Sequence, residues 1–254
     1  MNYLTPEFIE DLESSKEEDM LEALSQEFKS MFPSRTRVLG KENLDLFLTH
    51  QQERARHYNY IYYDDLKRYT IIAFYLGTYF DEDKLYPWVQ TILKEDESFG
   101  VKVDSLMEKF QILSQQTMGK DYIYFLKALE KLEKLRVEHV ESFRTFEDIT
   151  NTLRRIYPQR VEAIGEAVLH SEVKVQKEEL RRLEMSNPLG AFTYMTAKFI
   201  LGSHVLKDPL YAWVGKYVHG TYVSKDEKSR ALFEKGKSRI RREIREINKM
   251  REEG

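Results

Sequence analysis

The sequence predicts an all-α protein that contains two copies of one multi-helix unit. Apolar residues make up 41% and charged residues 33% of the 254 residues, which is enough for a core beneath a strongly solvated surface. Only eleven glycines and six prolines are present, too few for a chain rich in strands or loops. Runs of Glu, Lys, Leu and Arg at helical spacing favour helices throughout the chain.

A repeated segment is the evidence for two copies. The segment 68–93, RYTIIAFYLGTYFDEDKLYPWVQTIL, has a counterpart 125 residues later, TYMTAKFILGSHVLKDPLYAWVGKYV, at 193–218. A shift of 125 aligns 28–93 with 153–218 without a gap, and 16 of these 66 positions are identical. Random pairs would agree at roughly one position in fifteen to twenty, given average amino-acid usage. We therefore predict a tandem duplication, with a first half at 1–118 and a second half at 119–254.

Each expected helix follows from apolar periodicity and from breakers or caps at its ends. Pro6 suits a first helical position, and Ser15 with Glu18 has the form of a capping box. In the first half, helices are expected over 15–31, 40–58, 64–76, 83–93 and 101–117. Gly119 marks the boundary between the halves. In the second half, helices are expected over 121–140, 145–157, 165–184, 187–204, 208–218 and 225–251.

The residues that both copies share are of the types that form breaks, turns and cores. The pairs around the repeated segment are Gly77 and Gly202, Asp83 and Asp208, Tyr86 and Tyr211, and Trp88 and Trp213. The glycines are expected to let the chain leave a helix with positive φ, or to allow close packing. The aspartates are expected to cap helices, and Pro209 after Asp208 supports this. The tryptophans are expected to fill the core of each half.

Composition excludes several classes of protein. The net charge is only −3, so no overall field would gather nucleic acid or anionic lipid. Cysteine is absent, which excludes disulfides and zinc sites built on thiolates. No apolar run approaches the ~18 residues that a membrane span requires. The N-terminus lacks the basic and apolar regions of a signal peptide, so a cytoplasmic protein is expected.

No motif predicts catalysis, a cofactor or a metal. His50, Glu53 and His57 could share one helix face, but the histidines are seven residues apart, whereas H-E-x-x-H places them four apart. The other copy has Val175 and Arg182 at the two histidine positions. Phosphate-binding glycine loops and a G-x-S-x-G elbow are absent from the sequence. The sequence therefore favours a non-catalytic binding protein.

Two acidic segments are the candidate contact surface for a partner. Residues 7–27 carry nine acids and one lysine, a run that more often forms a solvated helix face than a docking surface. The turn at 79–82 belongs to the first copy only, so it is the better place for a specific site. A basic partner would be steered to such acids. The expected contact residues are Tyr79, Phe80, Asp81, Glu82, Glu17, Glu18 and Asp19.

The C-terminal segment 225–254 leaves an alternative open. It has eleven basic and seven acidic residues, and its cluster at 235–245 could contact phosphates. Leu232, Phe233 and Ile240 contribute to an apolar stripe, which favours a helix packed on the body over a nucleic-acid arm.

Four landmarks of the first half occur in the same order in a known group of proteins. They are ERAR at 53–56, D-x-x-R-Y at 65–69, G-x-x-F-D-x-D at 77–83 and the Pro87-Trp88 pair. With them the first ~95 residues resemble small helical bacterial proteins encoded near type VI secretion and other contact-dependent toxin genes. The second copy departs from the pattern, since Phe80, Asp81 and Pro87 become Val205, Leu206 and Ala212.

The resemblance implies a partner and no reaction. It implies an immunity protein that neutralises a secreted antibacterial toxin in the cytoplasm, or an adaptor that loads such a toxin for export. It supplies no catalytic residue. The alternative function, of a different class, is nucleic-acid binding through the C-terminal basic cluster.

Overall fold

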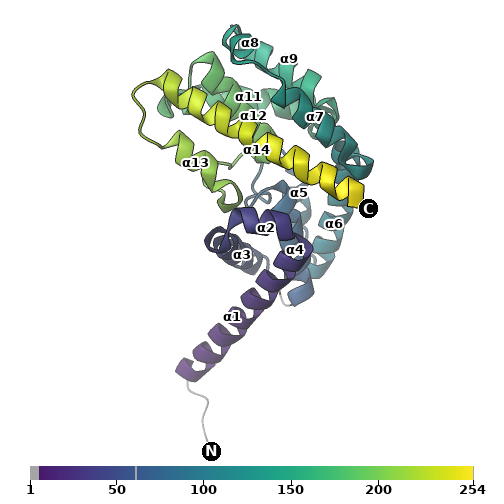
Figure 1. The fold of residues 1–254 in the computed structure, drawn as a ribbon. Coiled ribbons are helices and arrows are strands. Elements are labelled where there is room, and N and C mark those ends of the chain that lie inside the picture. Colours follow the sequence, from purple (N-terminus) through teal and green to yellow (C-terminus); the bar gives the residue numbers. More distant parts are fainter. Residues whose placement is uncertain (1–5, 61, 254) are drawn as a thin grey trace, which may run out of the picture.

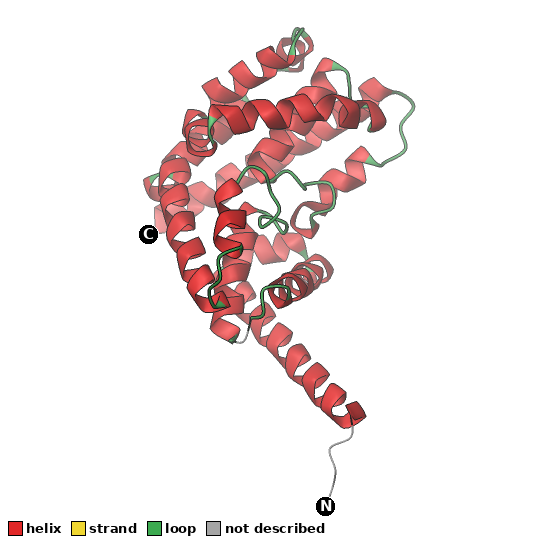
Figure 2. Cartoon of the chain, turned by 180° about the vertical axis from the view of Figure 1, so that it is seen from behind, coloured by secondary structure: helices red, strands yellow, loops and turns green. Residues whose placement is uncertain are grey.

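The described chain is helical and has no strand. A computed structural model describes residues 6–60 and 62–253, and within these ranges every regular element is a helix (Figures 1 and 2). The prediction of an all-α protein is confirmed.

The helices alternate with short connections along the chain. The first half contains α1 (Pro6–Met31), α2 (Pro33–Leu39), α3 (Lys41–Arg56), α4 (Tyr63–Leu76), α5 (Pro87–Leu93) and α6 (Phe99–Met118). The second half contains η1 (Lys120–Tyr122), α7 (Ile123–Glu133), α8 (Val137–Glu141), α9 (Phe146–Ile156), α10 (Pro158–Ile164), α11 (Glu166–Arg182), α12 (Pro188–Leu201), η2 (Pro209–Tyr211), α13 (Ala212–Val218) and α14 (Lys225–Glu253). Proline begins α2, α5, α10 and α12, where its missing N–H leaves no bond unmade.

Several helices of the two halves have matching bounds. α2, α4 and α5 begin and end 125 residues before α10, α12 and α13, and α3 begins 125 residues before α11. The matched helices also make a matched contact. Arg35 donates to the carbonyl of Phe74 at 2.9 Å, and Arg160 donates to the carbonyl of Phe199 at 2.6 Å. The common origin of the halves remains a prediction.

Several expectations about the helices are wrong. The helix expected from Asp83 begins at Pro87, and α2 and α10 were not expected. α1 runs unbroken from Pro6 through Ser15, so Ser15 does not begin a helix. Good helix formers stand on both sides of that serine, and propensity outweighs a single capping pattern. The expected helix over 121–140 instead breaks after Glu133 and resumes at Val137. Lys237 of α14 donates to the Leu135 carbonyl at 3.0 Å, a tertiary contact that stabilises the break.

One apolar core extends through both halves. It contains Leu24 and Phe28 of α1 and reaches Leu232 and Phe233 of α14, all at most 5% exposed. Phe28 lies edge-on to Phe74 with 5.3 Å between ring centroids. α14 crosses the second half and packs on α12, α7 and α13 (Figure 1). The expected packing of this helix on the body is therefore observed.

The tryptophans do not fill the core. Trp88 and Trp213 are only partly buried and pack against its edge. α5 and α13 have seven residues each, and the side chains there that are completely buried are Val89, Val214 and Val218. In the tyrosine pair Tyr86 and Tyr211, Tyr86 is buried at 1% exposure, and Tyr211 packs partly buried against the core.

Candidate functional site

Two loops meet where the halves join, and Asp208 connects them. Its carboxylate accepts from the backbone N–H of Leu210 at 2.9 Å, which caps η2 as the sequence predicts. It also accepts from the backbone N–H of Thr78 in the other half, at 2.9 Å, and from the Thr78 hydroxyl. Asp208 is 2% exposed, so these bonds form away from water.

Asp83 makes the reciprocal contact. Its carboxylate accepts from the backbone N–H of Leu85 at 2.9 Å and from that of Ser203, in the second half, at 2.7 Å. Each aspartate therefore holds its own loop and the loop of the other half. The predicted helix cap is observed at Asp208 but is wrong for Asp83, because α5 begins only at Pro87. The contacts between the halves were not predicted.

Gly77 and Gly202 allow the loops to approach closely. Their φ values are +108° and +107°, in the region that glycine adopts readily. A Cβ on Gly77 would lie 3.2 Å from Asp208 Oδ2, and a Cβ on Gly202 would lie 3.2 Å from Asp83 Oδ2. Both expected roles of these glycines, positive φ and close packing, are observed.

The buried carboxyl of Asp208 should make stability depend on pH. Burial raises its pKa to about 6, against the opposing effect of the hydrogen bonds from Thr78. Because the unfolded value is about 3.9, the folded state holds this proton more tightly. Stability should therefore fall as pH rises from about 4 to about 6, by up to about 1.4 kcal/mol per unit. Urea unfolding of wild type and Asp208→Asn across this range measures it, and a constant difference between the two would contradict the assignment.

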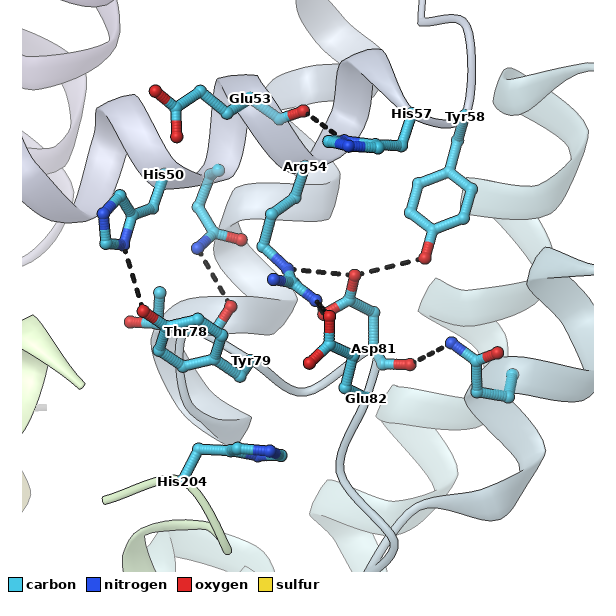
Figure 3. Close-up of polar contacts among 12 residues, drawn as sticks. His50, Glu53, Arg54, His57, Tyr58, Thr78, Tyr79, Asp81, Glu82 and His204 are labelled. Atoms are coloured by element: carbon cyan, nitrogen blue, oxygen red, sulfur yellow. Dashed lines mark hydrogen bonds and ion pairs between the residues drawn. The ribbon is translucent and has the colours of Figure 1, made fainter. Parts of the chain in front are cut away.

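Arg54 of α3 binds the two carboxylates of the acidic turn, Asp81 and Glu82. Its Nε donates to Asp81 at 2.8 Å, and Nη2 lies 2.7 Å from Glu82 Oε1. The Asp81 carboxylate, 1% exposed, also accepts from the Tyr58 hydroxyl at 3.2 Å. Burial and the nearby Asp81 raise the pKa of Tyr58 to about 12, so it remains a donor at neutral pH. The turn is therefore folded inward onto α3 by an ion pair (Figure 3).

Tyr79, on the same turn, is partly buried. Its hydroxyl lies 3.4 Å from Nδ1 of His50, and its ring centroid is 5.5 Å from that of His204 (Figure 3). The ammonium of Lys207 lies 3.9 Å from the ring centroid and the Arg54 guanidinium 5.1 Å, both within cation–π range. Side chains of both halves therefore surround this one tyrosine.

We define the Tyr79 surface as Tyr79, His50, Arg54, Glu82, His204 and Lys207. Glu82 and Lys207 are exposed, and the other four are partly buried. The hydrogen bond from Arg54 lowers the pKa of Glu82, and burial lowers that of His204. At neutral pH the surface thus presents a carboxylate and two cations around an aromatic ring.

Some of the predicted contact residues are buried in the structure and others are exposed. Phe80 and Asp81 are buried, at 0% and 1% exposure, so the prediction that they form a contact surface is wrong. Arg54 and the apolar core draw them inward, although the local sequence has the composition of an exposed turn. Glu18 and Asp19 are exposed on α1, and the described contacts of the Tyr79 surface do not include them. The side chain of Glu17 lies outside the described residues.

The histidine-rich face of α3 does not gather metal ligands. Nδ1 of His57 lies 2.8 Å from the carbonyl of Glu53, while His50 faces Tyr79. Among the described residues, no three His, Asp or Glu side chains lie close enough together to hold a metal ion.

Four residues of the Tyr79 surface, His50, Arg54, His204 and Lys207, were not among the predicted contacts. The two copies differ at each position: His50 matches Val175, Arg54 matches Glu179, and His204 and Lys207 match Tyr79 and Glu82. This difference between copies was the signal that could have found them.

Comparison of the chain with protein-family models, curated proteins and solved structures finds no match. Within the described residues, no helix combines the length and apolar character that crossing a membrane requires.

Proposed function

We propose that this protein acts by binding another protein through the Tyr79 surface. The observation that carries the proposal is the position of Tyr79, held at the junction of the halves between Lys207 and Arg54. Tyrosine and arginine are enriched among residues that dominate binding energy in protein interfaces. Because Asp83 and Asp208 fix the loops beneath it, the ring is preorganised and little entropy would be lost on binding.

We further propose that the partner is a secreted antibacterial toxin, which this protein neutralises in the cytoplasm. The resemblance of the first ~95 residues to proteins encoded beside such toxins supports this identity. Duplication of an ancestral helical unit is part of the same proposal. The matched helix bounds and the reciprocal Asp83 and Asp208 contacts support it. The unshared turn at 79–82 would then have become the specific surface of a duplicated scaffold.

Substitution of Tyr79 should abolish protection from the toxin encoded next to this gene. In bacteria that express the toxin, wild type should restore growth. Tyr79→Ala should weaken binding of the purified toxin by about thirtyfold or more, the effect of losing an interface hot spot. Titration calorimetry with the purified toxin, together with the growth assay, measures both effects.

Tyr62→Ala is the matched control, since Tyr62 is 67% exposed in the connection before α4. It should protect as wild type does. Equal killing with and without wild-type protein would refute the immunity role. If the protein instead leaves survival unchanged and export of the toxin fails without it, the adaptor role holds.

The nucleic-acid alternative receives no support from α14. Arg241 pairs with Glu133 at 2.9 Å and Arg230 with Glu141 at 3.3 Å. The apolar side of the same helix is buried against the body. These pairs reduce the positive field that phosphate binding requires, and we do not propose this function.

A further inference from the structure

A cavity of about 760 Å³ lies between α14 and the junction of the halves. Much of its wall is apolar, with side chains that include Phe74, Tyr75, Leu113, Phe125, Ile200 and Ile240. Met31 and Met250, 42% and 51% exposed, also line it, so the cavity opens to solvent. Its volume falls within the ~300–1,000 Å³ of small-molecule sites.

The cavity is positively charged. Arg35, Arg37, Arg239 and Arg242 line it, and none of them has a carboxylate partner among the described residues. Arg160, Lys237 and Lys249 add positive charge, against Glu243 and Glu246. The lining therefore combines an apolar wall with an excess of cations.

Two polar groups of this lining have no hydrogen-bond partner. Nε of Arg239 is buried and unbonded, and the guanidinium carbon lies 5.7 Å from the ring centroid of Trp213. Burial and the nearby Arg242 lower the pKa of Arg239, as expected of an unpaired cation. The hydroxyl of Thr196, a residue 9% exposed, is also unbonded. Such groups lower stability unless a ligand or water bonds to them.

We propose that this cavity binds a single-chain fatty acid, with its carboxylate at Arg239 and its alkyl chain along the apolar wall. A carboxylate accepts from the unbonded Nε of Arg239 and offsets the repulsion between Arg239 and Arg242. The chain would cover the apolar side chains around Phe125 and Ile240. A neutral amphiphile would leave Arg239 and Arg242 without an anionic partner, and a cationic one would be repelled.

Titration of the full-length protein with matched amphiphiles tests the proposal. Dodecanoate, dodecan-1-ol and dodecyltrimethylammonium share one chain and differ in head group. Calorimetry below their micelle concentrations should show saturable binding of dodecanoate. Dodecan-1-ol should bind at least about tenfold more weakly, as the loss of a charge-assisted hydrogen bond implies. The cation should not bind measurably.

Variants separate the head-group site from the wall. Arg239→Gln should weaken dodecanoate binding by about tenfold and leave dodecan-1-ol unchanged. Arg241→Gln is the matched control, because Arg241 is exposed on the same helix and pairs with Glu133. Ala197→Phe, which fills part of the wall, should weaken both ligands. Thermal unfolding of each variant checks that it folds.

Absence of saturable dodecanoate binding to wild type would overturn the proposal. So would equal affinity for dodecanoate and dodecan-1-ol with no effect of Arg239→Gln, because the cavity would then lack an anion site. None of the six residues of the Tyr79 surface lines the cavity. Failure here would therefore leave the proposed protein-binding function untouched.

Discussion

Asp208→Ala should lower the free energy of unfolding by about 2–4 kcal/mol at pH 7. The substitution removes the acceptor for the backbone amides of Thr78 and Leu210, which are bonded away from water. Each buried donor left unbonded costs about 1–3 kcal/mol, and relief from burying a charge offsets part of this loss. Urea unfolding followed by circular dichroism measures the change from the midpoint and slope.

Two further variants test whether the effect comes from the junction of the halves. Asp83→Ala should also destabilise, because Asp83 accepts from the amides of Leu85 and Ser203. Asp64→Ala should change stability by less than about 0.5 kcal/mol, since the Asp64 side chain is 80% exposed. If Asp208→Ala differed from Asp64→Ala by less than about 1 kcal/mol, the reciprocal contacts would not stabilise the junction.

Most of the helices, and the cap at Asp208, could be predicted because local signals determine them. Gly202 ends α12, and apolar periodicity identifies most of the helical segments. The short helices α2 and α10, which begin at Pro33 and Pro158, were not predicted. The cap at Asp208 is equally local, because its carboxylate accepts from the backbone N–H of Leu210, two residues later. The second contact of Asp208 spans 130 positions to a backbone amide. A backbone amide is present at nearly every residue, so no sequence pattern marks the one that is used.

The candidate site could be located only in part. The difference between the copies directed attention to the turn at 79–82, and Tyr79 and Glu82 do lie at the surface. Phe80 and Asp81 were predicted to lie at the surface but are buried. The composition of a turn does not show which of its side chains fold inward. That choice depends on Arg54, 27 positions earlier. Lys207 approaches Tyr79 from the other half, so only the assembled halves bring it there.

Arg54→Leu should lower the free energy of unfolding by about 3–5 kcal/mol, the usual result of removing one partner from a buried ion pair. It would leave the Asp81 carboxylate, 1% exposed, without its ion-pair partner but still accepting from the Tyr58 hydroxyl. Asp81→Leu should destabilise less, because the Arg54 side chain is 17% exposed and retains Glu82 as a partner. Urea unfolding of both variants at pH 7 measures the two losses.

The double variant Arg54→Leu, Asp81→Leu shows whether the ion pair or the packing beneath it stabilises the turn. Without either charge, two leucines can fill the space, and replacing a buried pair with apolar residues is often neutral. The double variant should therefore be more stable than the sum of the single losses implies, by at least about 2 kcal/mol. Simple additivity would show that the pair contributes nothing specific. Strong coupling would mean that Arg54 and Asp81 together hold the turn on which Tyr79 lies.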